Sequence, residues 1–153
     1  MSERNIRLDD VMPLMLEKLS AGQSVSFSPR GVSMLPLIKE GRDSVTLSPV
    51  EGRLRRFDVP LYRRKNGQYV LHRVVRVGDS YTCVGDNQFA LEEGITDGQV
   101  IAVMTSMVRK GKKITTKDPL YRLYCIFWHY SRLPRRVLRA LVIRVKRIFK
   151  AYI

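Results

Sequence analysis

The chain has few cysteines. Cys83 and Cys125 are the two cysteines among its 153 residues, and each lies in an apolar run with no second cysteine nearby. This spacing excludes a CxxC metal or redox motif and does not suggest a disulfide scaffold. We expect both to be buried, reduced thiols, which is the usual state of a free cysteine.

Long apolar runs are also missing. No stretch reaches the roughly 18 to 20 apolar residues of a membrane-spanning helix. The first ten residues, MSERNIRLDD, lack the basic region and apolar run of a secretory signal. We therefore expect a cytoplasmic protein, or one held peripherally at the cytoplasmic membrane.

Acidic residues are scarce. The chain has 14 Asp and Glu against 28 Lys and Arg, which gives a net charge of +14. Residues 117–153 contribute +9 of this, with ten Lys and Arg and a single aspartate, Asp118. An excess of this size indicates an acidic partner, either nucleic acid or an anionic membrane surface.

Apolar periodicity divides the chain into three segments. Residues 1–23 hold an N-terminal helix, because apolar residues recur at helical spacing over 7–20, before Ala21-Gly22. Residues 24–116 show short strands separated by turn signals, which predict a mainly β, barrel-type or sandwich-like domain. Residues 117–153 form a basic, amphipathic helical region.

The strands of the β segment follow from alternation and from turn residues. Asn66-Gly67 predicts a hairpin turn. The proline in 58–64 predicts an edge strand, and 68–77 predicts one long strand. The expected strands are 24–28, 44–50, 58–64, 68–77, 80–85 and 99–110.

Three short stretches combine residues that can perform serine chemistry. They are GVSMLP with Ser33, VLHRVV with His72 and VGDNQ with Asp86. A serine hydroxyl is a weak nucleophile that needs a neighbouring base, and a histidine base works best when an acid fixes its tautomer. Each residue also has a structural interpretation alone: a turn serine, a core histidine and an Asx turn.

The order and wording of these stretches resemble the S24/S26 group of serine peptidases, which includes type I signal peptidases and self-cleaving repressor peptidases. Ser33-Met34-Leu35-Pro36 is similar to the nucleophile box of signal peptidases. His72-Arg73-Val74-Val75, with the later Gly85-Asp86-Asn87, is similar to the histidine form of archaeal, endoplasmic-reticulum and some Gram-positive enzymes. The resemblance covers residues 24 to 105.

This resemblance implies a catalytic site. Ser33 would be the nucleophile, His72 the general base and Asp86 the acid that orients His72. Glu92 stands six residues after Asp86, where some members carry a second acid. It is therefore a candidate second acid.

The resemblance also implies how a substrate would be held. Gly31 stands where many signal peptidases carry a serine that helps to bind the oxyanion. The backbone amides of Val32 and Ser33 would then form the oxyanion hole. The substrate groove would be lined by Met34, Leu35 and Pro36.

The helical segment 117–153 predicts contact with an anionic membrane surface, because an apolar stripe opposes a basic face. The alternative is a helix packed on the β domain with a solvated basic face. We expect no nucleic-acid partner, since a duplex does not need the continuous apolar stripe. The expected membrane contacts are Trp128, Arg136, Arg139, Lys146, Arg147 and Lys150.

The resemblance implies a serine endopeptidase that cleaves an extended leader or signal-type peptide or preprotein, and we expect no metal or cofactor. We expect neither the N-terminal membrane anchor of signal peptidases nor the helix-turn-helix domain of repressor peptidases, since 1–23 provides only a short helix. Two alternatives remain open. One is an inactive peptide-binding module, and the other is a regulator that cuts itself at Ala21-Gly22.

Overall fold

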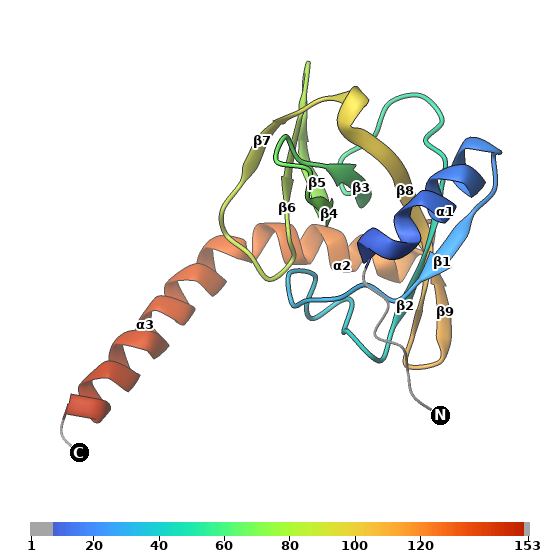
Figure 1. Cartoon of the computed structure of the whole chain (residues 1–153). Coiled ribbons are helices and arrows are strands. Elements are labelled where there is room, and N and C mark those ends of the chain that lie inside the picture. The colour runs from blue at the N-terminus through green and yellow to red at the C-terminus, as the bar shows by residue number, and fades with distance from the viewer. Residues whose placement is uncertain (1–7, 152–153) are drawn as a thin grey trace.

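A computed structural model describes residues 8–151, which form a sheet-built body and a helical arm (Figure 1). The helices are α1 (Leu8–Ser20), α2 (Pro119–Tyr130) and α3 (Arg132–Ala151), with a short 3-10 turn η1 (Asp97–Gln99). The strands are β1 (Val25–Phe27), β2 (Ser44–Ser48), β3 (Pro60–Arg63), β4 (Tyr69–Leu71), β5 (Arg73–Val77), β6 (Tyr81–Val84), β7 (Glu92–Ile95), β8 (Val100–Arg109) and β9 (Lys112–Thr115).

The strands pair into two antiparallel sheets. One has the order β1-β2-β8-β3-β4, with β9 also paired to β8, and the other has the order β5-β6-β7. Neither order of the described strands closes on itself, so the barrel is not confirmed. Helix and strand occupy similar shares of the chain, and the prediction of a mainly β fold is therefore corrected to a mixed one. The antiparallel sheets, the short N-terminal helix and the C-terminal helical region agree with the sequence.

Helix α1 packs on the larger sheet through residues spaced three and four apart. Met12, Met15 and Leu19 are buried in the same cluster as the inward residues of β2 and β8. The helix ends at Ser20, and the next turn is closed by the Gly22 amide, which donates to the Leu19 carbonyl. Gly22 has a φ of 76°, a left-handed conformation that favours glycine.

The segment expected as one strand, 68–77, is two strands in different sheets. Strand β4 ends at Leu71 in the larger sheet, and β5 begins at Arg73 in the smaller one. His72 is the single residue between them and is 2% exposed. The polypeptide therefore crosses between the sheets at this histidine.

Strand β3 is not at an edge. It pairs with β4 on one side and with β8 on the other. The sheet accommodates Pro60 because it is the first residue of the strand, and the pairing with β8 shifts register between Leu61 and Tyr62.

The two cysteines are free and buried, as expected. Burial raises the pKa of the Cys83 thiol to about 12. Burial also raises the pKa of Cys125, which lies on the inner side of α2. Neither thiol is therefore a ready nucleophile.

Helix α2 lies along one side of the body, and α3 extends from it as an arm (Figure 1). No helix in the described range 8–151 combines the length and apolar content needed to cross a bilayer.

Candidate functional site

A cavity of about 420 Å³ opens between the ends of the larger sheet and the turn that carries Ser33. Ser33 and His72 both line it, although they are 39 residues apart in the chain. Apolar side chains form much of the wall, namely Phe27, Met34, Ile38, Leu61, Val70 and Leu71. Polar lining residues include Ser28, Arg30, Arg64, Gln68 and Gln88.

Ser33 is held by an irregular turn between β1 and β2. The Leu35 amide donates to the Val32 carbonyl at 3.2 Å, and the Ile38 amide donates to the Met34 carbonyl at 2.9 Å. Met34 and Ile38 are buried, at 4% and 2% exposure, whereas Ser33 is half-buried. The apolar residues therefore anchor the turn in the core, and Ser33 lines the cavity.

The Gly85–Asn87 turn packs directly against Ser33. The Asn87 amide donates to the Ser33 carbonyl at 2.8 Å, and Asn87 Nδ2 donates to the Val32 carbonyl at 3.2 Å. A Cβ atom at Gly85 would lie 2.6 Å from the Ser33 carbonyl oxygen and 3.1 Å from Ser33 Cβ. Glycine is needed here because the two backbones approach so closely.

His72 is paired with Glu92. His72 Nδ1 lies 3.1 Å from Glu92 Oε1 and 3.3 Å from the Tyr62 hydroxyl. In the tautomer that carries its proton on Nδ1, facing the Glu92 carboxylate, Nε2 is the free basic nitrogen of the ring. Burial lowers the pKa of His72 and outweighs the opposing effect of Glu92. The ring is therefore neutral near pH 7, which is the form that a general base requires.

Glu92 is itself held in place by two neighbours. Arg64 Nε donates to Glu92 Oε2 at 2.8 Å, a second guanidinium nitrogen pairs with Oε1, and the Tyr62 hydroxyl donates to Oε2 at 3.0 Å. Burial alone would raise the pKa of Glu92, but the hydrogen bonds from Arg64 and Tyr62 and the nearby His72 together lower it. Glu92 therefore remains ionised beside His72.

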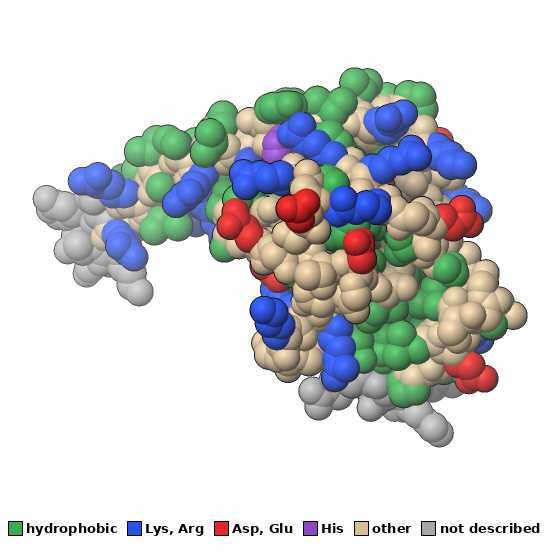
Figure 2. Space-filling view, turned by 90° about the horizontal axis from the view of Figure 1, so that it is seen from above, with side chains coloured by type: hydrophobic (Ala, Val, Ile, Leu, Met, Phe, Trp, Pro, Cys, Tyr) green, Lys and Arg blue, Asp and Glu red, His purple; other side chains and the backbone are tan. Residues whose placement is uncertain are grey.

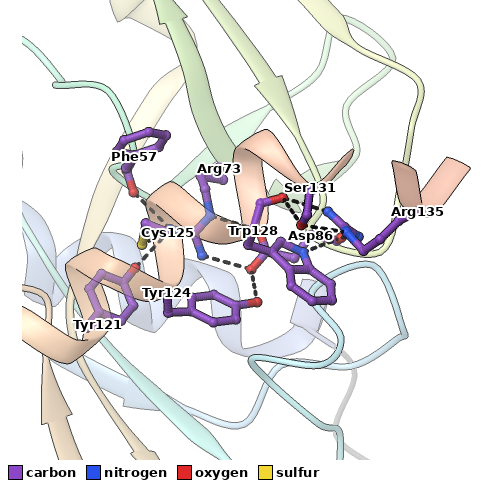
Figure 3. Close-up of polar contacts among 9 residues, drawn as sticks. All are labelled: Phe57, Arg73, Asp86, Tyr121, Tyr124, Cys125, Trp128, Ser131 and Arg135. Carbon is purple, nitrogen blue, oxygen red and sulfur yellow. Dashed lines mark hydrogen bonds and ion pairs between the residues drawn. The ribbon is translucent and has the colours of Figure 1, made fainter. Parts of the chain in front are cut away.

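Asp86 has a different partner from the expected one. Arg73 Nε and another guanidinium nitrogen each donate to its carboxylate at 2.8 Å, and the Tyr124 hydroxyl donates at 3.0 Å (Figure 3). The expected pairing of Asp86 with His72 is thus corrected, because both carboxylate oxygens are engaged elsewhere. The carboxylate on the histidine is that of Glu92.

Trp128 lies on the inner side of α2 and is not placed as an outward membrane contact. Its indole Nε1 donates to the Asp86 carbonyl at 2.7 Å, and its ring stacks on Tyr124. The Arg135 guanidinium lies 3.7 Å from the centroid of the Trp128 ring (Figure 3). These contacts join α2 and the first turns of α3 to the turn that touches Ser33.

Of the residues expected to line the substrate groove, one lines the cavity and two do not. Met34 lines the cavity, whereas Leu35 and Pro36 are not among its lining residues. Both Ser33 and His72 are described, and no hydrogen bond joins the Ser33 hydroxyl to the His72 ring. Catalytic hydrogen bonds of unliganded enzymes are often long and tighten when substrate binds. The oxyanion role of the Val32 and Ser33 amides stays a prediction.

The other expected membrane contacts lie on α3. Exposed side chains there include Arg136, Arg139, Lys146 and Arg147. The side chain of Lys150 is outside the described part of the chain. His129 packs edge-on to Phe57 and lies 2.9 Å from an Arg56 guanidinium nitrogen, which agrees with a packing role.

Sequence reasoning missed Tyr62 and Arg64. The signal that could have found them is strand alternation, because residues two apart in an extended segment share a face. Tyr62 and Arg64 are two apart, and both reach Glu92. Arg73 stood in the His-Arg-Val motif, but its buried pair with Asp86 depends on a long-range contact.

No family model, curated protein or solved structure matches this chain.

Proposed function

We propose that the protein is a serine endopeptidase in which Ser33 is the nucleophile, His72 the general base and Glu92 the acid that orients His72. The observation that carries the proposal is that His72 lines the same cavity as Ser33 and that its Nδ1 is paired with the carboxylate of Glu92. Titratable pairs with shifted pKa values that lie beside a cavity cluster at functional sites, which supports this assignment.

The proposed reaction is acyl transfer to Ser33. Its Oγ attacks the carbonyl carbon of a peptide bond, and the hydroxyl proton passes to His72 Nε2. His72 then gives that proton to the departing amine, which leaves an ester on Ser33. Water, activated by the same histidine, hydrolyses the ester. The Val32 and Ser33 amides would stabilise the negative oxygen of each tetrahedral intermediate.

The proposed substrate is an extended peptide of the leader or signal type. Strands β1 and β4 are the two ends of the path of the larger sheet, and residues of both line the cavity. Free strand edges pair with extended peptides through main-chain hydrogen bonds. The apolar wall around Phe27, Leu61 and Val70 would suit small or apolar side chains before the scissile bond.

The test is cleavage of a peptide library with small residues before the scissile bond, read by mass spectrometry. Wild type should cut, and Ser33→Ala, His72→Ala and Glu92→Gln should each lose most of the activity. Asp86→Asn, compared at a temperature where it remains folded, should retain more activity than Glu92→Gln. Cleavage by Ser33→Ala at the wild-type rate would refute the proposal.

A second candidate is an inactive peptide-binding module, which is favoured by the absence of a Ser33–His72 hydrogen bond. It predicts that wild type and Ser33→Ala bind library peptides with equal affinity and that neither cleaves them. Fluorescence anisotropy with the tightest-binding peptide distinguishes this outcome from a peptidase whose substrate is not in the library.

A further inference from the structure

Helix α2 has two apolar faces, and only one is covered. Its inner face buries Tyr121 and Cys125 in the body. Its outer face carries Leu120, Leu123 and Phe127, which are 80%, 60% and 68% exposed. An uncovered apolar patch of large side chains marks an interaction site in a folded protein.

Helix α3 continues the exposed apolar surface. Residues spaced three and four apart share one face of a helix. On α3 these are Leu133, Val137, Leu138, Leu141, Val145 and Phe149, each at least 49% exposed. Figure 2 shows hydrophobic side chains along the arm, with Lys and Arg side chains beside them.

The opposite face of α3 is basic. By helical spacing Arg136, Arg139, Lys146 and Arg147 lie together on it, and all are exposed. Asp118 is the single acidic residue of the whole segment 117–153, which has a net charge of +9. The surface thus joins a strip of apolar side chains to a dense row of fixed positive charges.

We propose that the outer face of α2 and the apolar face of α3 together form a docking surface for an anionic phospholipid bilayer. In this arrangement the helices lie in the plane of the membrane surface, with apolar side chains among the acyl chains and basic ones among the headgroups. A second copy of the chain fits less well, because a symmetric contact would bring two segments of +9 together.

The docking surface is joined to the body by polar contacts as well as apolar ones. Trp128 and Arg135 both donate to the Asp86 carbonyl, and Tyr124 donates to the Asp86 carboxylate. Asp86 belongs to the turn that packs on Ser33. A bilayer that holds α2 therefore also fixes the position of the cavity relative to the membrane. The docking proposal does not depend on the peptidase proposal.

The test is sedimentation of the full-length Ser33→Ala protein with vesicles of phosphatidylcholine alone or mixed with phosphatidylglycerol. This variant separates binding from cleavage. We expect binding to the mixed vesicles that weakens as salt rises, and little binding to the neutral ones.

A matched pair of variants tests the apolar face. Leu141 and Ile143 are isomeric side chains of similar exposure, 54% and 45%, but helical spacing places Ile143 on the basic face. Leu141→Glu should weaken vesicle binding by about tenfold or more, because it removes a leucine side chain from contact with the acyl chains. Ile143→Glu makes the same change of charge and should weaken binding less.

Three results would overturn the proposal. The first is that the protein binds neither vesicle type. The second is that Leu141→Glu and Ile143→Glu lose vesicle binding to the same extent. The third is a dimer in sedimentation velocity that Leu141→Glu dissociates. The last result would assign the face to a second copy. Circular dichroism melting of both variants should match that of the parent, because both positions are exposed, and this controls for loss of folding.

Discussion

His72 and Arg73 are adjacent in the chain, and each has a carboxylate partner, but the two pairs have different surroundings. His72 lines a cavity, and its partner Glu92 has a partly exposed side chain. The Arg73–Asp86 pair is enclosed, with both side chains 2% exposed. One acid thus lies beside a histidine and the other beside a guanidinium group. His72 and Arg73 are equally buried, so the two pairs differ in the exposure of the acid and in whether the base lines the cavity.

The largest expected effect is on the pair whose histidine lines the cavity. Glu92→Gln should lower kcat for a cleaved peptide by about 10⁴-fold, as expected when the acid of a triad no longer fixes the histidine tautomer. The measurement is steady-state cleavage at pH 7. Asp86→Asn provides the comparison, and an equal loss of kcat in a folded Asp86→Asn protein would show that the two acids are not separated in role.

The next effect is on the enclosed pair. Asp86→Asn should lower the free energy of unfolding by about 3 to 5 kcal/mol, because it leaves the buried Arg73 charge without its partner. Urea unfolding followed by tryptophan fluorescence measures this, since Trp128 lies on Asp86. The exposed pair of Arg76 and Glu93, 3.7 Å apart, is the control. Glu93→Gln should leave the midpoint nearly unchanged.

Gly85 lies against the Ser33 backbone, and a change there is expected to have an intermediate effect. Gly85→Ala should destabilise the fold by about 1 to 3 kcal/mol, because the new methyl group would overlap the Ser33 carbonyl. It should also reduce cleavage by displacing Ser33. Gly98→Ala is the matched control, since a Cβ there meets nothing within 4 Å. Equal stability of the two variants would contradict the close approach.

The smallest expected effect is on the pH profile. Burial lowers the pKa of His72, so cleavage should fall on the acid side only below the ordinary histidine range of about 6.5. Because the unfolded chain binds this proton more readily, the His72 contribution to stability is present above pH of about 6.5. It is lost as the pH falls from there through the folded pKa of His72.

Glu92→Gln sharpens this measurement. The carboxylate raises the pKa of His72, and its removal should move the acid limb of any residual activity to still lower pH. Arg64→Ala is the comparison: Arg64 lowers the pKa of His72, so its loss should move the limb the other way. An unchanged limb in both variants would mean that the profile reports a different group.

The local features of the fold follow from the sequence because they depend on near neighbours. The helical stripe of Met12, Met15 and Leu19 predicted the buried face of α1. Ser33 and His72 were proposed from their motifs, and both line one cavity. The sequence did not show that Glu92 pairs with His72 and that Asp86 pairs with Arg73. His72 and Arg73 fall at a crossing between two sheets, and the pairing of β4 and β5 with distant strands decides where each side chain points.

The contrast between near-neighbour patterns and long-range contacts also applies to the C-terminal segment. The run LYRLYCIFWHY is apolar on nearly all sides, so the sequence does not show which side faces the body. In the structure one side is covered by the body and the other is bare, because the body offers only one surface for α2. The assignment of Trp128 to the inner side depends on its contact with Asp86, which lies 42 residues earlier in the chain.

The Gly85–Asn87 turn has a mechanical consequence. Its first and third residues contact the Ser33 turn, and its middle residue carries the hydrogen bonds from α2 and the start of α3. The arm and the serine are therefore joined through three consecutive residues, in addition to the hydrogen bonds between α2 and Arg73 of β5. Slow hydrogen exchange at the Asn87 amide would report the stiffness of this joint, and tension that loosens the joint would also release the serine from its place in the cavity.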